Sequence, residues 1–484
     1  MPEIDQGTNV CYVCVGDEFL NREIQLEGQN EHCSFCGCLR KTVSLEEMSD
    51  QIHEILQEHF YLTSSEPEGL DYLLAKEGLW ERPGEPVENV IADIAQLNEE
   101  IAKAIRECLS DQHGYCAVRD GEEDPYADDA LYEENRIDDW EFQETWNAFR
   151  EEITSRSRFF SQHAQEALDE IFGEIDTLSS FGGTPVIRDI SPTDDERYIF
   201  RARVSFSDKE LEEILSAPVK QIGPPPSRRA KAGRMNAAGI SVFYGAIDKE
   251  TCIAEARAPV GSYVVLGRFE VIRPVRLLDF DTLTKVYVEG SHFDPNYHTG
   301  RSRAAFLRRL VHEISRPVMP RDEEFEYLPT QVVSEYLAAR VEPRLDGIVF
   351  HSSQTAGEGR NLVLFNHACG VEPYELPKGT EIDIHMGWVS EDDCDDSITI
   401  FETVLDKPSE QKQQDEPPEP FGFSNIGSID IPEDDPDSNA MHDDSTLRLD
   451  LDSVSVQEIK SVSYTTSIRS VSRHRSTKGE DQPF

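Results

Sequence analysis

The sequence predicts a multidomain protein with a cysteine-rich knuckle at residues 1–42, an α-helical region at 43–180, an α+β domain at 185–403 and a disordered acidic tail at 404–484. Three observations lead to this prediction. A chain of 484 residues is too long for one ordinary domain. The apolar residues change from helical to strand-like patterning near Tyr198. The tail is rich in Asp, Glu, Ser, Pro and Gln, and the low hydrophobic content of the chain (38%) also indicates an unfolded part.

Two CxxC pairs stand in the knuckle region, formed by Cys11 with Cys14 and by Cys33 with Cys36. Their separation lies in the range of about 15–20 residues that is typical of four-cysteine zinc sites. Each CxxC turn directs two sulfurs at one centre, and four thiolates leave no open coordination position. We therefore expect a structural Zn²⁺ ion at these four cysteines. Cys38 is a candidate substitute for Cys36, and a redox pair is the alternative.

The region at 43–180 shows helical periodicity. Ser44 precedes its first apolar run and Glu47 follows three residues later, which is the pattern of a capping box. A Gly-Gly pair and Pro185 end the helical part. We expect three helices, at 45–60, 90–108 and 140–175, the last of them broken near Ser155.

The region at 185–403 alternates short strand-like runs with helical stretches at irregular spacing, which indicates an α+β or mixed-sheet domain rather than a doubly wound fold. The expected strands are Tyr198–Val204, Ser241–Tyr244, Tyr263–Val271 and Gly347–Phe350. The expected helices are Asp208–Ser216, Lys249–Ala258, Arg301–Ser315 and Thr330–Val341. In the tail, a weakly alternating stretch at Leu447–Val456 is a candidate for ordering on a partner.

Charge and apolar patterning exclude several classes of protein. The formal net charge of −49 repels phosphate backbones and anionic lipids, so we expect no broad nucleic-acid binding. No apolar run is long enough for a membrane span. The first residues do not show the basic region followed by an apolar stretch that is typical of a signal peptide, so we expect none. Ten cysteines in a chain of this length are too sparse for a disulfide scaffold. We therefore expect a cytoplasmic protein.

Several sequence blocks follow one another in the α+β region. Arg201 lies in a strand-like run, and Arg234 lies in a loop of small residues that leads to Tyr244. Glu255 lies in an expected helix, and Ser352 follows the last apolar run. The blocks are Tyr198–Arg203, Gly233–Gly239, Ser241–Ala246, Thr251–Arg257, Leu345–Ser352 and Gly359–Phe365.

The order of these blocks resembles the RES domain family, which is named for a dispersed arginine, glutamate and serine. The matching positions are Arg201, Glu255 and Ser352. The chain departs from the family at Met235, where a bulky aromatic residue is usual. Each block alone is weak, and the resemblance depends on their order and spacing.

The resemblance implies a fold similar to ADP-ribosyltransferase toxins and an NAD⁺ pocket. Family members are NAD⁺ phosphorylases or NAD⁺ glycohydrolases, often toxins paired with an antitoxin protein, and some are described as ADP-ribosyltransferases. By this resemblance Glu255 contacts the nicotinamide-side ribose, Arg201 holds the diphosphate and Ser352 lines the pocket. Tyr244 packs against the substrate, and Arg234 is a second basic residue of the pocket.

The chemistry of NAD⁺ cleavage suits these residue types. Breaking the nicotinamide–ribose bond passes through an oxocarbenium-like state, which a carboxylate such as Glu255 stabilises. Nicotinamide is already a cationic leaving group, so one carboxylate suffices. An arginine fork matches the diphosphate, and inorganic phosphate is a candidate co-substrate. Spacing does not choose between Arg201 and Arg203, because residues two apart on a strand share a face.

The knuckle followed by helices resembles the HEPN/RES region that precedes some RES domains. Some HEPN bundles are ribonucleases with an arginine and a histidine five to seven positions apart, and Arg158 with His163 matches this pattern. We therefore expect a HEPN-like helical bundle and keep an RNase as an alternative activity, although the acidity of the chain disfavours RNA. A non-catalytic interaction protein is a further alternative. The acceptor, the antitoxin and the oligomeric state stay open.

Overall fold

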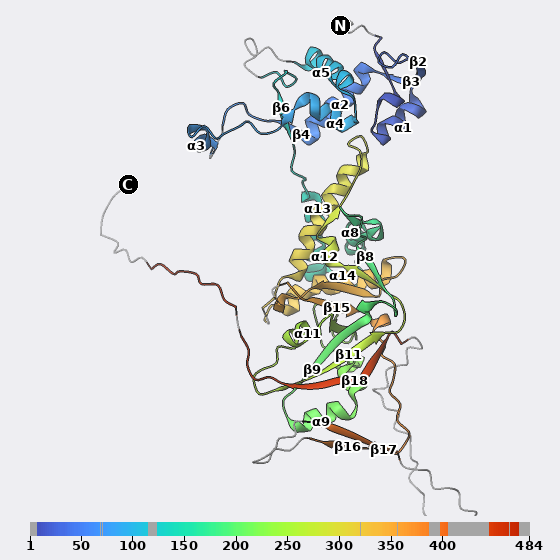
Figure 1. Cartoon of the computed structure of the whole chain (residues 1–484), viewed down its shortest axis with the longest axis vertical. Helices are drawn as coiled ribbons and strands as arrows, with labels where there is room; N and C mark the ends of the chain where they lie inside the picture. Colours follow the sequence, from blue (N-terminus) through green and yellow to red (C-terminus); the bar gives the residue numbers. More distant parts are fainter. Residues whose placement is uncertain are drawn as a thin grey trace, which may run out of the picture. The chain divides into compact units, whose positions relative to one another are not determined.

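The computed structural model describes residues 7–67, 69, 71–114, 123–319, 321–355, 357–386, 397–404, 445–463 and 465–473 (Figure 1). The chain divides into two compact units. Unit 1 contains residues 1–187 and 279–316, and unit 2 contains residues 188–278 and 317–484. This differs from the expected division, because residues 279–316 lie within the sequence of the α+β domain but pack with the N-terminal unit. None of the helices in the described ranges is long and apolar enough to cross a membrane.

The cysteine-rich region of unit 1 forms a small three-stranded sheet with the order β1-β3-β2. Its elements are β1 (Asn9–Cys11), the 3-10 helix η1 (Tyr12–Cys14), α1 (Glu18–Glu27), β2 (Gln29–His32) and β3 (Leu39–Ser44). Asp17 caps α1 by accepting a hydrogen bond from the backbone nitrogen of Leu20. The turns around the sheet bring the two CxxC pairs together.

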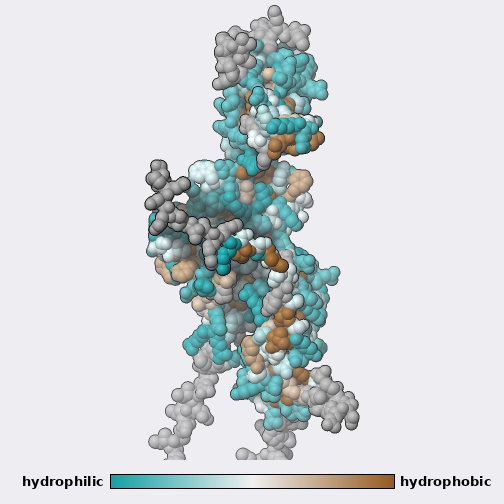
Figure 2. Space-filling view, turned by 90° about the vertical axis from the view of Figure 1, so that its left-hand side faces the viewer, coloured by the Kyte–Doolittle hydropathy of each residue, from teal (hydrophilic) through white to brown (hydrophobic). Residues whose placement is uncertain are grey.

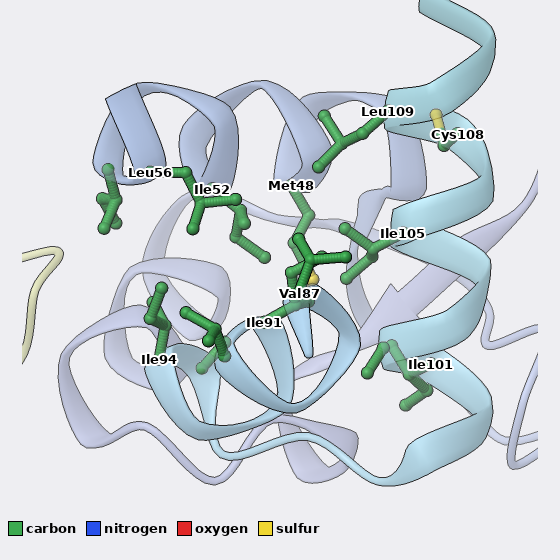
Figure 3. Close-up of a cluster of buried hydrophobic side chains, with 14 of the residues drawn as sticks. Met48, Ile52, Leu56, Val87, Ile91, Ile94, Ile101, Ile105, Cys108 and Leu109 are labelled. Carbon is green, nitrogen blue, oxygen red and sulfur yellow. The ribbon is translucent and has the colours of Figure 1, made fainter. Parts of the chain in front are cut away.

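Three helices enclose the main apolar core of this unit: α2 (Leu45–His59), α4 (Val87–Ala95) and α5 (Glu99–His113). Their apolar side chains point toward one another in Figure 3, with Met48 and Ile52 from α2 facing Ile91 and Ile105 from the other two helices. The predicted cap of α2 is confirmed, because Ser44 Oγ accepts a hydrogen bond from the backbone nitrogen of Glu47 at 3.1 Å.

The prediction of one continuous helix at 90–108 is wrong. Gln96 takes a left-handed conformation with φ of 49° and ends α4. Asn98 then caps α5, since its Oδ1 accepts a hydrogen bond from the backbone nitrogen of Ile101 at 2.9 Å. Asn98 followed by two glutamates is an N-terminal helix signature that could have shown this break in the sequence.

Among the described residues, the rest of unit 1 combines short strands with five further α-helices. A three-stranded sheet has the order β4-β6-β5. The predicted break near Ser155 is confirmed, because a π-helical turn η2 and a bend at 157–161 separate α7 from α8. The elements are β4 (Phe60–Leu62), α3 (Asp71–Lys76), β5 (Glu85–Pro86), β6 (Leu131–Glu134), α7 (Trp140–Glu151), η2 (Glu152–Arg156), α8 (Gln162–Phe172), η3 (Ile175–Thr177), β7 (Ser179–Ser180), α12 (Phe280–Leu283), β13 (Val286–Tyr287) and α13 (Pro295–Ser315).

Polar side chains attach α13 to the helices of the N-terminal region. Glu313 pairs with Arg150 on α7 at 3.0 Å, and Arg309 pairs with Asp139 at 3.0 Å. Arg303 donates to the carbonyl oxygen of Ile171 on α8 at 2.8 Å. These contacts join segments more than 130 residues apart, and they explain why the residues at 279–316 belong to unit 1.

Unit 2 is built on an eight-stranded sheet with the order β18-β11-β9-β10-β15-β14-β12-β8, which confirms the predicted α+β character (Figure 1). The strands are β8 (Ile187–Ile190), β9 (Tyr198–Ser205), β10 (Phe243–Ala246), β11 (Tyr263–Val271), β12 (Val275–Asp279), β14 (Gly347–His351), β15 (Arg360–Leu364) and β18 (Leu447–Glu458). The helices are α9 (Asp208–Ser216), α10 (Pro218–Ile222), α11 (Lys249–Ala256) and α14 (Glu323–Arg340). A separate hairpin pairs β16 (Glu381–His385) with β17 (Thr399–Thr403).

The tail departs from the predicted disorder at β18. This strand pairs antiparallel with β11, and Leu447 and Leu449 are buried in the core of unit 2. Arg268 and Asp450 form an ion pair across the two strands. The ordering expected for Leu447–Val456 therefore takes place on the chain's own sheet, while residues 405–444 and 474–484 lie outside the described residues. On the face shown in Figure 2, hydrophilic residues predominate among those drawn in colour.

Candidate active site

Glu255 lies near the end of α11, a short helix whose start and end are determined by neighbouring residues. Asp248 caps its start, because its carboxylate accepts hydrogen bonds from the backbone nitrogen of Thr251 at 2.7 Å and from the Thr251 hydroxyl at 2.8 Å. Arg257 ends the helix in a left-handed conformation with φ of 48°. Cys252 packs against the sheet with Ala246. This anchored helix presents Glu255 at its last turn.

Two side chains hold one oxygen of the Glu255 carboxylate. The Ser352 hydroxyl donates to Glu255 Oε1 at 2.6 Å, and Asn361 Nδ2 donates to the same oxygen at 2.7 Å. No hydrogen bond between the described residues reaches Oε2. Ser352 is only 1% exposed and also accepts a hydrogen bond from the backbone nitrogen of Gln354 at 3.1 Å. Ser352 is therefore buried beside Glu255 and holds its carboxylate in place.

The hairpin of β14 and β15 also packs against the first turn of α11. A Cβ atom added to Gly359 would lie 1.8 Å from Thr251 Oγ1, so only glycine permits this close approach. The backbone nitrogen of Ile247 donates to the carbonyl oxygen of Arg360 at 3.0 Å. The hairpin thus contacts α11 at its first turn and again at Glu255, which limits movement of the carboxylate.

Tyr244 projects from the same sheet face as Asn361. In the register of β10 with β15, Tyr244 lies opposite Val363 and Ala246 lies opposite Asn361. Residues two apart on a strand share a face, so Tyr244 and Asn361 form a diagonal pair across the two strands. Tyr244 and Asn361, which donates to Glu255, are therefore neighbours on one face of the sheet.

The turn at 233–236 closes around the Tyr244 hydroxyl. This hydroxyl donates to Asn236 Oδ1 at 2.9 Å and accepts a hydrogen bond from the backbone nitrogen of Met235 at 2.9 Å. A Cβ atom on Gly233 would lie 2.7 Å from the hydroxyl oxygen. Burial raises the pKa of Tyr244 to about 12, so the phenol stays protonated. Met235 is buried here, which accommodates the departure from the family's aromatic residue.

Helix α14 holds the same turn from its other side. Thr330 donates to the carbonyl oxygen of Arg234 at 2.5 Å, and Gln331 donates to that of Gly233 at 2.8 Å. The Arg234 guanidinium lies 5.3 Å from the centre of the Tyr327 ring. Burial raises the pKa of Tyr327, and the nearby charges of Arg234 and Arg257 oppose this effect. Two arginines therefore flank one tyrosine beside the turn.

Arg201 and Arg203 have different surroundings on β9. Arg203 is exposed and donates to the carbonyl oxygen of Gln221 at 2.9 Å. Arg201 is half-buried and donates to the carbonyl oxygen of Tyr244 at 2.7 Å, with its guanidinium 5.0 Å from the Phe243 ring centre. Burial lowers the pKa of Arg201 to about 10, which still leaves it charged at neutral pH.

No hydrogen bond or ion pair among the described residues joins Arg201 to Glu255. Both charges nonetheless act on the Cys252 thiol of α11, whose pKa is raised first by burial, lowered by Arg201 and raised by Glu255. Phe243 and Tyr244 are consecutive strand residues, so their side chains point to opposite faces. The Arg201 guanidinium packs against Phe243 and links β9 to the strand that carries Tyr244. The structure therefore brings Glu255, Ser352 and Tyr244 to one face and leaves Arg201 as a connection between strands.

The four predicted metal-ligating cysteines converge in unit 1. The Sγ–Sγ distances are 3.7 Å for Cys11–Cys14, 3.6 Å for Cys11–Cys36 and 3.8 Å for Cys14–Cys33, and all four sulfurs lie within 4.8 Å of one another. Cys38 lies outside this group, with its sulfur 3.6 Å from the carbonyl oxygen of Cys36. The cluster therefore has the composition and spacing of a four-sulfur metal site.

Arg158 and His163 do not share a helix. Arg158 lies in the bend before α8, and His163 is an exposed residue in the first turn of that helix. Between them Phe160 takes a left-handed conformation with φ of 60°. Within the part of the chain that the structure describes, no contact joins the two side chains. The geometry gives the RNase alternative no support.

Asn361, Asn236 and Arg257 are the site residues that sequence reasoning missed. Asn361 stands at the start of the apolar run Leu362–Phe365, where a buried polar side chain needs a partner. Asn361 also lies in the block Gly359–Phe365, which was singled out in the sequence with no role assigned to the asparagine. Asn236 and Arg257 lie in motifs already singled out, but their partners become visible only in three dimensions.

Comparison with known protein families found two matches, and the RES match runs continuously across residues 279–316, which pack with unit 1. A family model described as RES domain matches residues 200–384. A second family model, described as HEPN/RES N-terminal domain 1, matches residues 26–167. A search of curated proteins and a search of solved structures each found no similar protein.

Proposed function

We propose that this chain, which carries a RES domain behind an HEPN/RES N-terminal domain 1, cleaves the nicotinamide–ribose bond of NAD⁺. The observation that carries the proposal is the Glu255 carboxylate, held at Oε1 by Ser352 and Asn361 while Oε2 faces no donor among the described residues. A fixed carboxylate with one oxygen available is what stabilises an oxocarbenium-like ribosyl group.

The bond breaks with its electron pair moving to the nicotinamide nitrogen. Nicotinamide then leaves as a neutral molecule, so its departure requires no general acid. The positive charge that develops on the ribosyl carbon faces Glu255, whose attraction is stronger in the transition state than for the bound substrate. Such differential binding lowers the barrier of the chemical step.

In this proposal the turn at 233–236 and the residues next to it bind the substrate. Tyr244 offers an aromatic face beside Glu255, and Arg234 offers a guanidinium suited to the diphosphate. Arg257, exposed two residues after Glu255, adds a second positive charge. Arg201 acts indirectly in this proposal, because its guanidinium holds the strand of Tyr244.

The acceptor is inorganic phosphate or water. Attack by a phosphate oxygen forms a carbon–oxygen bond and gives ADP-ribose-1″-phosphate, nicotinamide and a proton. Attack by water gives ADP-ribose, nicotinamide and a proton. We propose a toxin-like role for this activity, with an antitoxin protein as its partner, and a fold for the RES domain similar to ADP-ribosyltransferases.

We also propose that the four-cysteine cluster holds a structural Zn²⁺ ion. Tetrahedral coordination with Zn–S bonds of about 2.3 Å places sulfurs about 3.8 Å apart, which agrees with the distances of 3.6–3.8 Å here. Four sulfur ligands leave no position for substrate, so the ion would cross-link the knuckle.

The test is NAD⁺ consumption by the purified full chain, with and without inorganic phosphate, with the products resolved by mass. We expect nicotinamide release in the wild type and a loss of about 10²- to 10³-fold in Glu255→Gln, by analogy with the removal of one transition-state-stabilising group. Glu250→Gln on the same helix is the matched control, because Glu250 is exposed and lies outside the site. NAD⁺ that stays intact under both conditions would overturn the proposal.

A further inference from the structure

Asn361 occupies a position where a polar side chain needs a specific reason. It is the second residue of β15 and is 9% exposed. Its backbone pairs with Ala246 on β10 and with Phe350 on β14, so both neighbouring strands fix its place. The next three residues of β15 are buried and apolar. An amide in such surroundings costs free energy unless it is hydrogen-bonded, and the bond to Glu255 satisfies it.

The two donors on Glu255 Oε1 have different roles. The Ser352 hydroxyl is a single rotatable group, and one hydrogen bond leaves the carboxylate free to turn about its last torsion. Asn361 adds a second donor whose direction is set by a central strand. Two donors that converge on one oxygen fix the carboxylate plane, and Glu255 loses rotamer freedom before substrate arrives.

The chemistry of the asparagine amide suits this role. It is a neutral donor, so it orients the carboxylate without cancelling its negative charge. A lysine or arginine at the same place would form an ion pair with Glu255 and weaken its attraction for a ribosyl cation. An aspartate would place a second negative charge beside the first and remove the donor.

We infer that Asn361 is a positioning residue that, together with Ser352, fixes Glu255 so that Oε2 faces the ribosyl carbon of the substrate. This inference rests on the proposed NAD⁺ cleavage, because it assigns a role within that reaction. It adds a residue outside the arginine, glutamate and serine for which the domain is named.

The first experiment compares Asn361→Ala with the wild type in steady-state NAD⁺ cleavage. We expect kcat to fall about 10- to 100-fold, as for the loss of a hydrogen bond to a charged group, while KM changes less than about threefold. Asn366→Ala is the matched control, because Asn366 Nδ2 donates to the backbone carbonyl of Ser241 at 3.0 Å in the same unit. An unchanged kcat in Asn361→Ala, with an active wild type, would overturn the inference.

The second experiment needs no activity. A double-mutant cycle with Asn361→Ala and Glu255→Ala measures the coupling between the two side chains in urea unfolding. We expect the two stability losses to be non-additive, and additive losses would overturn the inference. The coupling could be present while the wild-type protein leaves NAD⁺ intact. In that case both the proposed function and the positioning role of Asn361 in that reaction would be wrong, and the contact between Asn361 and Glu255 would be structural.

Discussion

The histidine cluster of unit 1 predicts that this part of the protein loses stability in mild acid. His59 on α2 stacks on His298 of α13 with ring centres 3.3 Å apart, and the His292 ring centre lies 5.1 Å from that of His298. Glu134 and Arg301 also face the cluster and pair with each other. His292 Nδ1 and His298 Nε2 are buried without hydrogen-bond partners. A proton on any of these rings would face neighbouring rings and Arg301. The carboxylates of Glu58 and Glu134 favour the protonated rings, but the net pKa shift of all three histidines is downward because burial is the largest cause.

The magnitude follows from the pKa of His292. Burial lowers this pKa from 6.5 to about 4, with His298 as the next cause. The folded protein therefore binds fewer protons than the unfolded chain between pH 6.5 and 4, and stability is complete above this window and falls as pH decreases through it. Linkage between pH 7.5 and 5.5 gives a loss of about 1.3 kcal/mol from His292 alone. The lowered pKa values of His59 and His298, caused first by burial, act in the same direction.

The assay is urea unfolding at pH 7.5 and 5.5, followed by tryptophan fluorescence, since Trp140 and Trp146 lie on α7 of this unit. His292→Gln cannot titrate at this position, so its unfolding free energy should depend less on pH than that of the wild type by about 1 kcal/mol. His163→Gln changes an exposed histidine on α8 and should keep the wild-type dependence. Equal pH dependence in His292→Gln and the wild type would refute the argument.

Two further predictions concern the knuckle and the last strand. Elemental analysis of the purified wild-type protein should find one zinc ion per chain. The Cys33→Ser variant should lose this zinc, and the Cys38→Ser variant should keep it. Loss of zinc in Cys38→Ser would contradict the assignment of ligands. Leu449→Ala should destabilise unit 2 by about 2–4 kcal/mol in urea unfolding, because Leu449 is 5% exposed in the core, whereas half-buried Leu451→Ala should cost less. Equal losses for both leucines would mean that β18 does not dock on β11 as described.

Local features were predictable because their causes lie close together in the chain. Ser44 and the apolar run after it determine the start and the buried face of α2 within one stretch of residues. The spacing of the four cysteines likewise indicated a shared site, although the segment between the two pairs is not a simple loop but contains α1 and β2. The single helix expected at 90–108 failed because apolar periodicity continues through Gln96, whose left-handed backbone leaves no trace in that pattern.

Pairings over long separations were not predictable. The alternating stretch at Leu447–Val456 was a candidate for ordering on a partner, but β11 lies far away in sequence, and only the tertiary structure shows that this stretch completes the chain's own sheet. The helix at Arg301–Ser315 was expected, but its membership of unit 1 depends on acidic and backbone partners such as Asp139 and Ile171. Such contacts depend on the packing of whole elements.

The candidate site shows the same division. The order of motifs made Glu255, Ser352 and Tyr244 candidate site residues through the resemblance to the RES domain family, and their roles stay predictions. The tertiary structure decided that Arg201 packs on the opposite face from Tyr244 and that Asn361 is the second donor to Glu255. A hydrogen bond between residues 106 positions apart depends on the register of three strands and the placement of α11. No local pattern encodes that register, so only the folded chain determines it.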